Sequence, residues 1–131
     1  MIVDTSAIIA VLKEDSDGPR FLHALTISTE PKRMSAANYL EAGIVVDANR
    51  NPLLSRRLDE LIVQTEIVVE PVTREQAEIA RAAYRDFGKG SGHPAGLNFG
   101  DCFSYEVAKE HSCPLLYVGD DFVHTDVVSA A

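Results

Sequence analysis

Short apolar segments alternate with segments of helical apolar spacing along this chain, and this alternation limits the folds that it can adopt. Four segments are predicted to be strands: Met1–Val3, Arg33–Ser35, Glu66–Glu70 and Pro114–Val118. A helix between two strands favours a right-handed crossover, which returns the second strand parallel to the first. The 131 residues suffice for one hydrophobic core. We therefore expect an α/β fold with a central parallel sheet, formed by residues 1–131 as a single domain.

Capping and breaking residues locate the helices between these strands. Thr73 and Gln76 have the spacing of a capping box, which predicts a helix that continues to about Phe87. Gly88–Gly100 contains five of the eight glycines, so we expect a mobile loop there. The other helices are predicted to begin near Ala7 and after Gly18-Pro19, to span Ala36–Arg50 and Leu53–Thr65 as a hairpin, and to run from Gly100 to about Ser112.

The composition excludes several classes of protein. No apolar run approaches the roughly 18 residues of a membrane span, and Asp4 leaves no room for a signal peptide, so we expect a cytoplasmic protein. The formal net charge of −8 argues against broad electrostatic attraction to nucleic acid. A nucleic-acid substrate would require metal ions and a local basic patch. The spacing of Cys102 and Cys113 fits neither a zinc knuckle nor a redox pair, so we expect reduced thiols.

Four acidic positions fall where an α/β fold can bring them together. Asp4 directly follows the first strand, and the pair Asp120-Asp121 follows the last one. Glu41 lies in the first long helix, and Asp101 lies in the first turn of the last helix. Open α/β sheets bind ligands beyond the carboxyl ends of their strands. We therefore expect these acids to face one crevice.

A crevice lined by carboxylates alone supports a limited range of chemistry. Clustered carboxylates repel one another unless their pKa values rise or a cation binds. Ligation by oxygen alone favours Mg²⁺ or Mn²⁺ over zinc, and Asp4 and Asp101 are the first candidates for metal ligands. Such ions orient and deprotonate a water molecule and neutralise charge on phosphoryl oxygens. The expected reaction is hydrolysis of a phosphodiester.

Each acid also has a purely structural explanation. Asp4 could cap the helix that begins near Ala7, Asp101 could interact with a helix dipole, and Asp120-Asp121 could form a turn. Glu41 could be solvated, although the apolar residues one turn further along the helix, Ile44 and Val45, are typical of a buried face. The occurrence of all four positions in one chain favours a functional site.

Five sequence blocks resemble those of PIN-domain proteins and, more closely, those of the VapC toxins of bacterial type II toxin-antitoxin pairs. The blocks are Met1–Ala7, Met34–Ala42, Leu97–Cys102, Ala108-Lys109 and Pro114–Phe122, and they extend over essentially the whole chain. The resemblance implies a PIN-like three-layer α/β/α fold with a central parallel sheet. It also implies a Mg²⁺- or Mn²⁺-dependent endoribonuclease with an acidic quartet of Asp4, Glu41, Asp101 and either Asp120 or Asp121.

The same resemblance implies three partners. RNA is the implied substrate, a cognate antitoxin is the implied inhibitor, and a second copy of the chain completes a homodimer. The helical hairpin Ala36–Thr65 could supply the dimer surface, and the hydroxyls of Thr5 and Ser6 would support the metal site. The chain departs from the family at Tyr117-Val118, where a Thr-Asn dipeptide is common.

Two other functions fit parts of the pattern. A PIN-like module that binds RNA or protein without cleavage would lack one or more of the acids, and none is missing. A metal-dependent phosphohydrolase of small molecules is the other alternative. An enzyme of that kind that forms an aspartyl-phosphate would need Asp-x-Asp after its first strand, where Ser6 occupies the second position.

The remaining polar residues carry weaker signals. Arg81, Arg85 and Lys89 recur every four residues, and they either pair with acids on a solvated helix face or contact RNA phosphates. Gly88–Gly92 lacks the spacing of a phosphate-binding loop, so no nucleotide site is expected there. The histidines show no metal-ligand spacing and are expected at the surface or in loops: His23, His93, His111 and His124.

Overall fold

The computed structural model describes residues 1–131 and contains four strands and six helices. The strands are β1 (Ile2–Val3), β2 (Lys32–Ser35), β3 (Ile67–Glu70) and β4 (Leu115–Leu116). The helices are α1 (Thr5–Leu12), α2 (Gly18–Ile27), α3 (Ala36–Asp47), α4 (Pro52–Gln64), α5 (Arg74–Phe87) and α6 (Phe99–His111). Every predicted element is present. The differences lie at the ends, since β4 is shorter than predicted, α3 ends at Asp47 rather than Arg50, and α1 begins at Thr5.

The four strands form one parallel sheet in the order β3-β2-β1-β4. The chain builds outward from β1 through β2 to β3 and then returns to add β4 on the other side of β1. This change of direction places a topological switch point between β1 and β4. Ligands of open α/β sheets bind at such a point, beyond the carboxyl ends of the strands.

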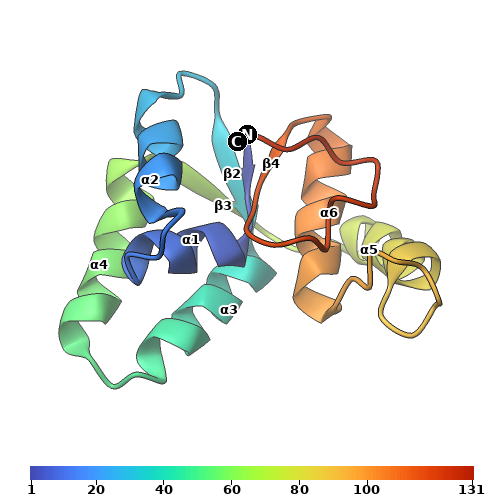
Figure 1. The fold of residues 1–131 in the computed structure, drawn as a ribbon, viewed down its shortest axis with the longest axis horizontal. Helices are drawn as coiled ribbons and strands as arrows, with labels where there is room; N and C mark the ends of the chain where they lie inside the picture. Colours follow the sequence, from blue (N-terminus) through green and yellow to red (C-terminus); the bar gives the residue numbers. More distant parts are fainter.

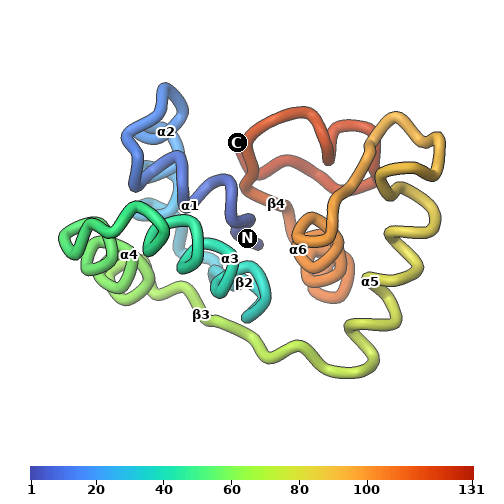
Figure 2. The backbone as a smooth tube through the Cα atoms, turned by 90° about the horizontal axis from the view of Figure 1, so that it is seen from below, coloured from blue at the N-terminus to red at the C-terminus, as the bar shows by residue number.

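Helices cover both faces of the sheet. Figure 1 shows α1, α2, α3 and α4 on one side and α5 and α6 on the other, and the turned view of Figure 2 shows the same division. Alternate strand residues supply the two hydrophobic cores: Val3 and Leu116 pack toward α1–α4, whereas Ile2 and Leu115 pack toward α5 and α6. The expected three-layer α/β/α fold with a parallel sheet is confirmed.

Local capping interactions explain where several helices begin. The predicted capping box is present at α5, where Thr73 Oγ1 accepts from the Gln76 amide and Gln76 Oε1 accepts from the Thr73 amide. The predicted hairpin is also confirmed, because α3 and α4 pack against each other and Asn51 caps α4. Both cysteines are free, as expected, and no helix is long and apolar enough to cross a membrane.

Candidate active site

Asp4 lies directly beyond β1 and is 4% exposed. It caps α1, because its Oδ2 accepts hydrogen bonds from the backbone amide and the hydroxyl of Ser6. Its Oδ1 accepts from the hydroxyl of Ser104 on α6, a residue one hundred positions away. The Ser6 hydroxyl in turn accepts from the amide of Val118, at 3.0 Å. The capping role and a position at the switch point therefore coexist in one residue.

Asp101 occupies the first turn of α6 and is 8% exposed. It forms a reciprocal capping box with Asn98, in which the Asp101 amide donates to Asn98 Oδ1 at 2.9 Å and the Asn98 amide donates to Asp101 Oδ2 at 3.0 Å. This second capping box is not among the helix signals taken from the sequence. It fixes the orientation of the carboxylate and leaves Asp101 Oδ1 without a hydrogen-bond partner.

Glu41 reaches the same region from α3, where its side chain is half-buried. Its carboxylate lies against the backbone of Gly100, so closely that a Cβ atom at position 100 would collide with both carboxylate oxygens. Glu41 was predicted to be buried because apolar residues lie one turn further along its helix. That reason was wrong, since Ile44 is 60% exposed. Glu41 is covered by the first turn of α6 and not by apolar neighbours on its own helix.

Asp120 and Asp121 are both exposed in the turn that follows β4. Of these two residues, only Asp121 lies close enough to Asp101 for its charge to raise the pKa of that carboxyl. Asp4 and Glu41 raise it in the same way. Asp120 makes no such contribution. The electrostatic coupling therefore favours Asp121 as the fourth member of the group.

Two buried residues that the sequence analysis missed hold these acids in place. Asn38 is fully buried on α3, and its Nδ2 donates to the carbonyl of Gly100 at 2.9 Å. The Ser104 hydroxyl lies between Asp4 Oδ1 and Asn38 Oδ1. Thr5 also contributes, since its hydroxyl donates to the carbonyl of Asn38. Helical spacing could have revealed both residues, because Asn38 lies three positions before Glu41 and Ser104 three after Asp101.

The effect of bringing these acids together is clearest in the pKa of Asp101. Burial, which is the largest cause, and the charges of Asp4, Asp121 and Glu41 together raise the pKa of Asp101 to about 7, against the opposing hydrogen bond from Asn98. None of the ion pairs in the structure involves these four acids. The group therefore lacks a cation from the chain itself.

The four acids suit a hard divalent cation, because they offer oxygen atoms alone. No three of them bring their oxygens within 4.8 Å of one another. Such spacing leaves room for the water molecules that Mg²⁺ retains when it binds proteins. Asp4 and Asp101 are the most firmly oriented of the candidate ligands, since hydrogen bonds fix both.

An apolar groove lies between α5 and α6, and one of its lining residues, Asn98, is hydrogen-bonded to Asp101. It has a volume of about 590 Å³ and begins beside Asp101, at Asn98 and Phe99. Arg81 and Lys89 line it, but Arg85 does not and pairs with Asp86 instead. The three basic residues therefore do not form one track along a helix, because α5 ends at Phe87 before Lys89.

Comparison with known proteins places this chain in a family. The PIN domain family matches residues 1–128. Ribonuclease VapC28 of Mycobacterium tuberculosis is 59% identical over 130 residues, which cover 99% of this chain and 97% of that protein. Ribonuclease VapC42 of the same species is 47% identical over 127 residues, which cover 97% of this chain and 96% of that protein.

Solved structures support the fold assignment. The crystal structure of Mycobacterium tuberculosis VapC20, described as a sarcin-ricin loop cleaving toxin, superposes with a TM-score of 0.76 at 16% identity and covers 97% of this chain and 95% of that one. A toxin-antitoxin complex from Klebsiella pneumoniae gives a TM-score of 0.72 at 15% identity and covers 99% and 97%. The chain therefore belongs to the PIN-domain family and, within it, to the VapC ribonucleases, the toxins of toxin-antitoxin systems.

Proposed function

We propose that this ribonuclease is an endonuclease that depends on Mg²⁺ or Mn²⁺ and uses Asp4, Glu41, Asp101 and Asp121. The observation that carries the proposal is the convergence of these acids, from four separate segments, at the switch point of the sheet without any cationic partner. A non-catalytic module would have no reason to retain such mutual repulsion.

The chain's own residues would divide the work of the site. Asp4, held by Ser6 and Ser104, and Asp101, held by Asn98, would bind the ion directly. The half-buried Glu41 and the exposed Asp121 would orient water and substrate oxygens around it. The bound ion would supply Lewis acidity, which activates water and neutralises charge on the phosphoryl group.

The groove between α5 and α6 is the proposed path for the RNA strand. Arg81 and Lys89 would contact phosphates there, while Tyr84 and Phe99, which is 78% exposed, offer aromatic faces for bases. This local pair of basic residues reconciles an RNA substrate with a net charge of −8. The groove leads to Asn98, beside Asp101, so a bound strand would reach the acids.

The antitoxin is proposed to act on the same surface. An Arg or Lys side chain of a basic segment would pair with the unbalanced acids and displace the metal, while apolar side chains would cover the groove beside Phe99. The toxin-antitoxin complex of similar fold supports such a partner. Growth arrest on expression of the chain alone, relieved by co-expression of the neighbouring gene, would test it. Harmless expression of the chain at a high level would count against it.

A homodimer is proposed from the exposed apolar residues near the site. Leu40 and Ile44 on α3 are 61% and 60% exposed, and α3 packs beside α6, which carries the exposed Phe99. A shared surface of this kind would bury Leu40 and Ile44 and leave Phe99 free to line the groove. Sedimentation of a monomer at micromolar concentration would contradict this part of the proposal.

The acids provide the first test. Asp4→Asn and Asp101→Asn should each lower the rate of RNA cleavage by about a hundredfold or more, because each keeps the side-chain shape and removes ligand charge. Asp121→Asn should have a larger effect than Asp120→Asn. Single-turnover cleavage of a labelled RNA with Mg²⁺ measures these rates. Asp59→Asn, on the exposed face of α4, is the matched control. Full cleavage by both the Asp4 and the Asp101 variants would refute the assignment.

Removal of the metal provides the second test. Excess chelator should stop cleavage, and added Mg²⁺ or Mn²⁺ should restore it. Calcium should restore it poorly, because its longer bonds and looser geometry suit the site less well. The fraction of RNA cleaved before and after each addition is the measurement. Undiminished cleavage in chelator would indicate a mechanism without metal.

The pKa of Asp101 provides a test that does not depend on activity. In chelator, the folded protein keeps a proton on Asp101 up to about pH 7, whereas the unfolded chain loses it near pH 3.8. The unfolded state therefore binds fewer protons between these pH values, and the free energy of unfolding falls as the pH rises. Above pH 7 the whole loss of unfolding free energy is present. It amounts to at most about 4 kcal/mol, because each pKa unit corresponds to about 1.4 kcal/mol.

The Asp101→Asn variant should not show this loss of unfolding free energy as the pH rises. The melting temperature of the variant minus that of the unaltered protein should therefore increase from pH 5 to pH 7 and then stay constant. Asp59→Asn should show a difference that does not vary with pH. A constant difference for Asp101→Asn as well would mean that burial does not raise the pKa of Asp101.

A further inference from the structure

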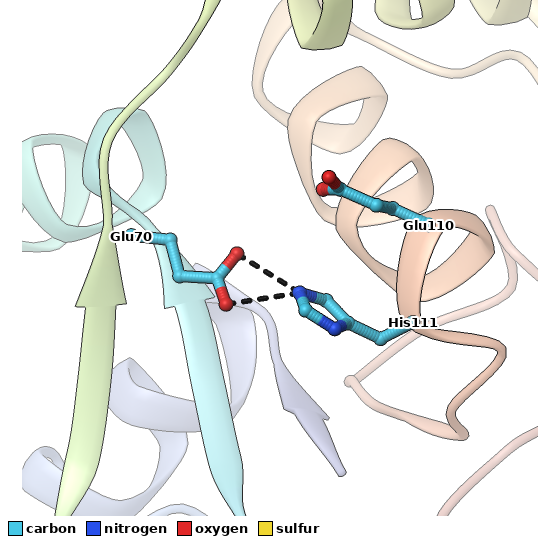
Figure 3. A group of neighbouring side chains, drawn as sticks. All are labelled: Glu70, Glu110 and His111. Carbon is cyan, nitrogen blue, oxygen red and sulfur yellow. Dashed lines mark hydrogen bonds and ion pairs between the residues drawn. The ribbon is translucent and has the colours of Figure 1, made fainter.

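A second polar cluster lies between β3 and the C-terminal half of α6, and it shares no residue with the active site. Glu70 is the last residue of β3, and Glu106, Glu110 and His111 belong to α6. Figure 3 shows Glu70 and His111 pointing toward each other from the strand and the helix, with the side chain of the preceding residue, Glu110, beside them. The cluster includes a histidine that was expected only at the surface or in a loop.

The ligand atoms of this cluster are closely spaced. His111 Nε2 lies 2.9 Å from Glu70 Oε1 and 3.0 Å from Glu70 Oε2. One ligand atom from each of Glu70, Glu110 and His111 lies within 4.8 Å of the other two. The acids of the active site do not approach one another so closely.

Glu106 places a buried carboxyl oxygen without a hydrogen-bond partner beside this cluster. Its side chain is 1% exposed, and its Oε1 is the one buried side-chain polar atom in the structure without a hydrogen-bond partner. It lies one helical turn before Glu110. Burial, the charge of Glu110, a hydrogen bond with the Glu110 carboxyl and the charge of Glu70 together raise the pKa of Glu106 to about 7. An unpaired buried carboxyl oxygen is costly unless something binds it.

The other polar groups around the cluster leave the ligand atoms available. Arg33 Nη1 contacts Glu70 Oε1 at 3.1 Å, and Gln76 Nε2 donates to Glu110 Oε2 at 2.8 Å. Glu106 Oε1 and Glu110 Oε1 therefore have no partner, whereas Glu70 Oε2 and His111 Nε2 contact each other and would exchange that contact for a bound ion. Arg33 balances one of the three carboxyl groups, and Gln76 is neutral, so the cluster retains an excess of negative charge.

We propose that Glu70, Glu110 and His111, whose ligand atoms lie together, bind one divalent transition-metal ion of the zinc type, with the buried carboxyl of Glu106 as the fourth ligand. An imidazole with carboxylates favours Zn²⁺ over Mg²⁺, which takes oxygen ligands and keeps much of its water. Four protein ligands are the number found in structural zinc sites. The acidic site beside Asp4, which has no histidine, would keep its preference for a hard ion.

The site would have a structural role. β3 is an edge strand, paired only with β2, and the ion would tie its last residue to the end of α6. An ion that binds only the folded state stabilises it by mass action. Zinc at a hundredfold above its Kd should therefore raise the melting temperature by roughly 5–10 °C.

Zinc binding to the purified full chain tests the proposal. The experiment uses the double variant Asp4→Asn/Asp101→Asn, in excess Mg²⁺, so that zinc at the active site does not contribute. Equilibrium dialysis with metal analysis should find one Zn²⁺ per chain. Adding His111→Gln or Glu110→Gln should weaken binding by about a hundredfold and abolish the rise in melting temperature. Glu106→Gln should do the same.

Matched substitutions elsewhere separate a built site from general attraction to an acidic protein. His124→Gln and Glu75→Gln replace exposed residues of the same types and should leave zinc binding within about twofold. Glu110 is exposed, so Glu110→Gln is decisive if Glu106→Gln fails to fold. Unchanged binding in the Glu110 and His111 variants, or equal losses in the two controls, would overturn the proposal.

Discussion

The hydrogen bond from Ser104 to Asp4 is the contact on which the active site depends, because it joins α6 to the end of β1. Without it, Asp4 and Asp101 would belong to segments that are linked only indirectly, through Thr5, Asn38 and the Gly100 carbonyl. Asn38 extends the link to α3 through its contacts with Ser104 and the Gly100 carbonyl. A small set of neutral side chains thus holds negatively charged groups together against their repulsion, at the cost of a raised pKa at Asp101.

The two acidic clusters of this protein differ in the chemistry that they offer. The acids at the switch point carry only oxygen atoms, are not closely clustered and adjoin a groove. The cluster at Glu70 includes His111, brings its ligand atoms within 4.8 Å and adjoins an edge strand. Ligand type and spacing therefore favour a hard, partly hydrated ion at the first and a structural ion of the zinc type at the second.

The net negative charge of the chain is compatible with a ribonuclease, because the basic residues proposed to contact RNA lie together in one groove. Arg81 and Lys89 line the groove beside Asp101, whereas Arg33, Arg74 and Arg85 are occupied by acidic partners. RNA would thus be attracted by a narrow path and by the bound metal, not by the surface as a whole. In the proposed mode of inhibition, a basic segment of an antitoxin would bind the same unbalanced acids.

The sequence by itself determined the elements, the parallel sheet and the acids at Asp4, Glu41 and Asp101, because apolar spacing, caps and strand ends are local signals. Strand order is not a local signal, so only the tertiary structure brought β4 beside β1 and placed Asp121, rather than Asp120, close enough to Asp101 to raise its pKa. The burial of Glu41 was predicted for the wrong reason, since Gly100 covers it. His111 and Glu70 showed no pattern at all, because their contact joins residues 41 positions apart and depends on how α6 packs across the sheet.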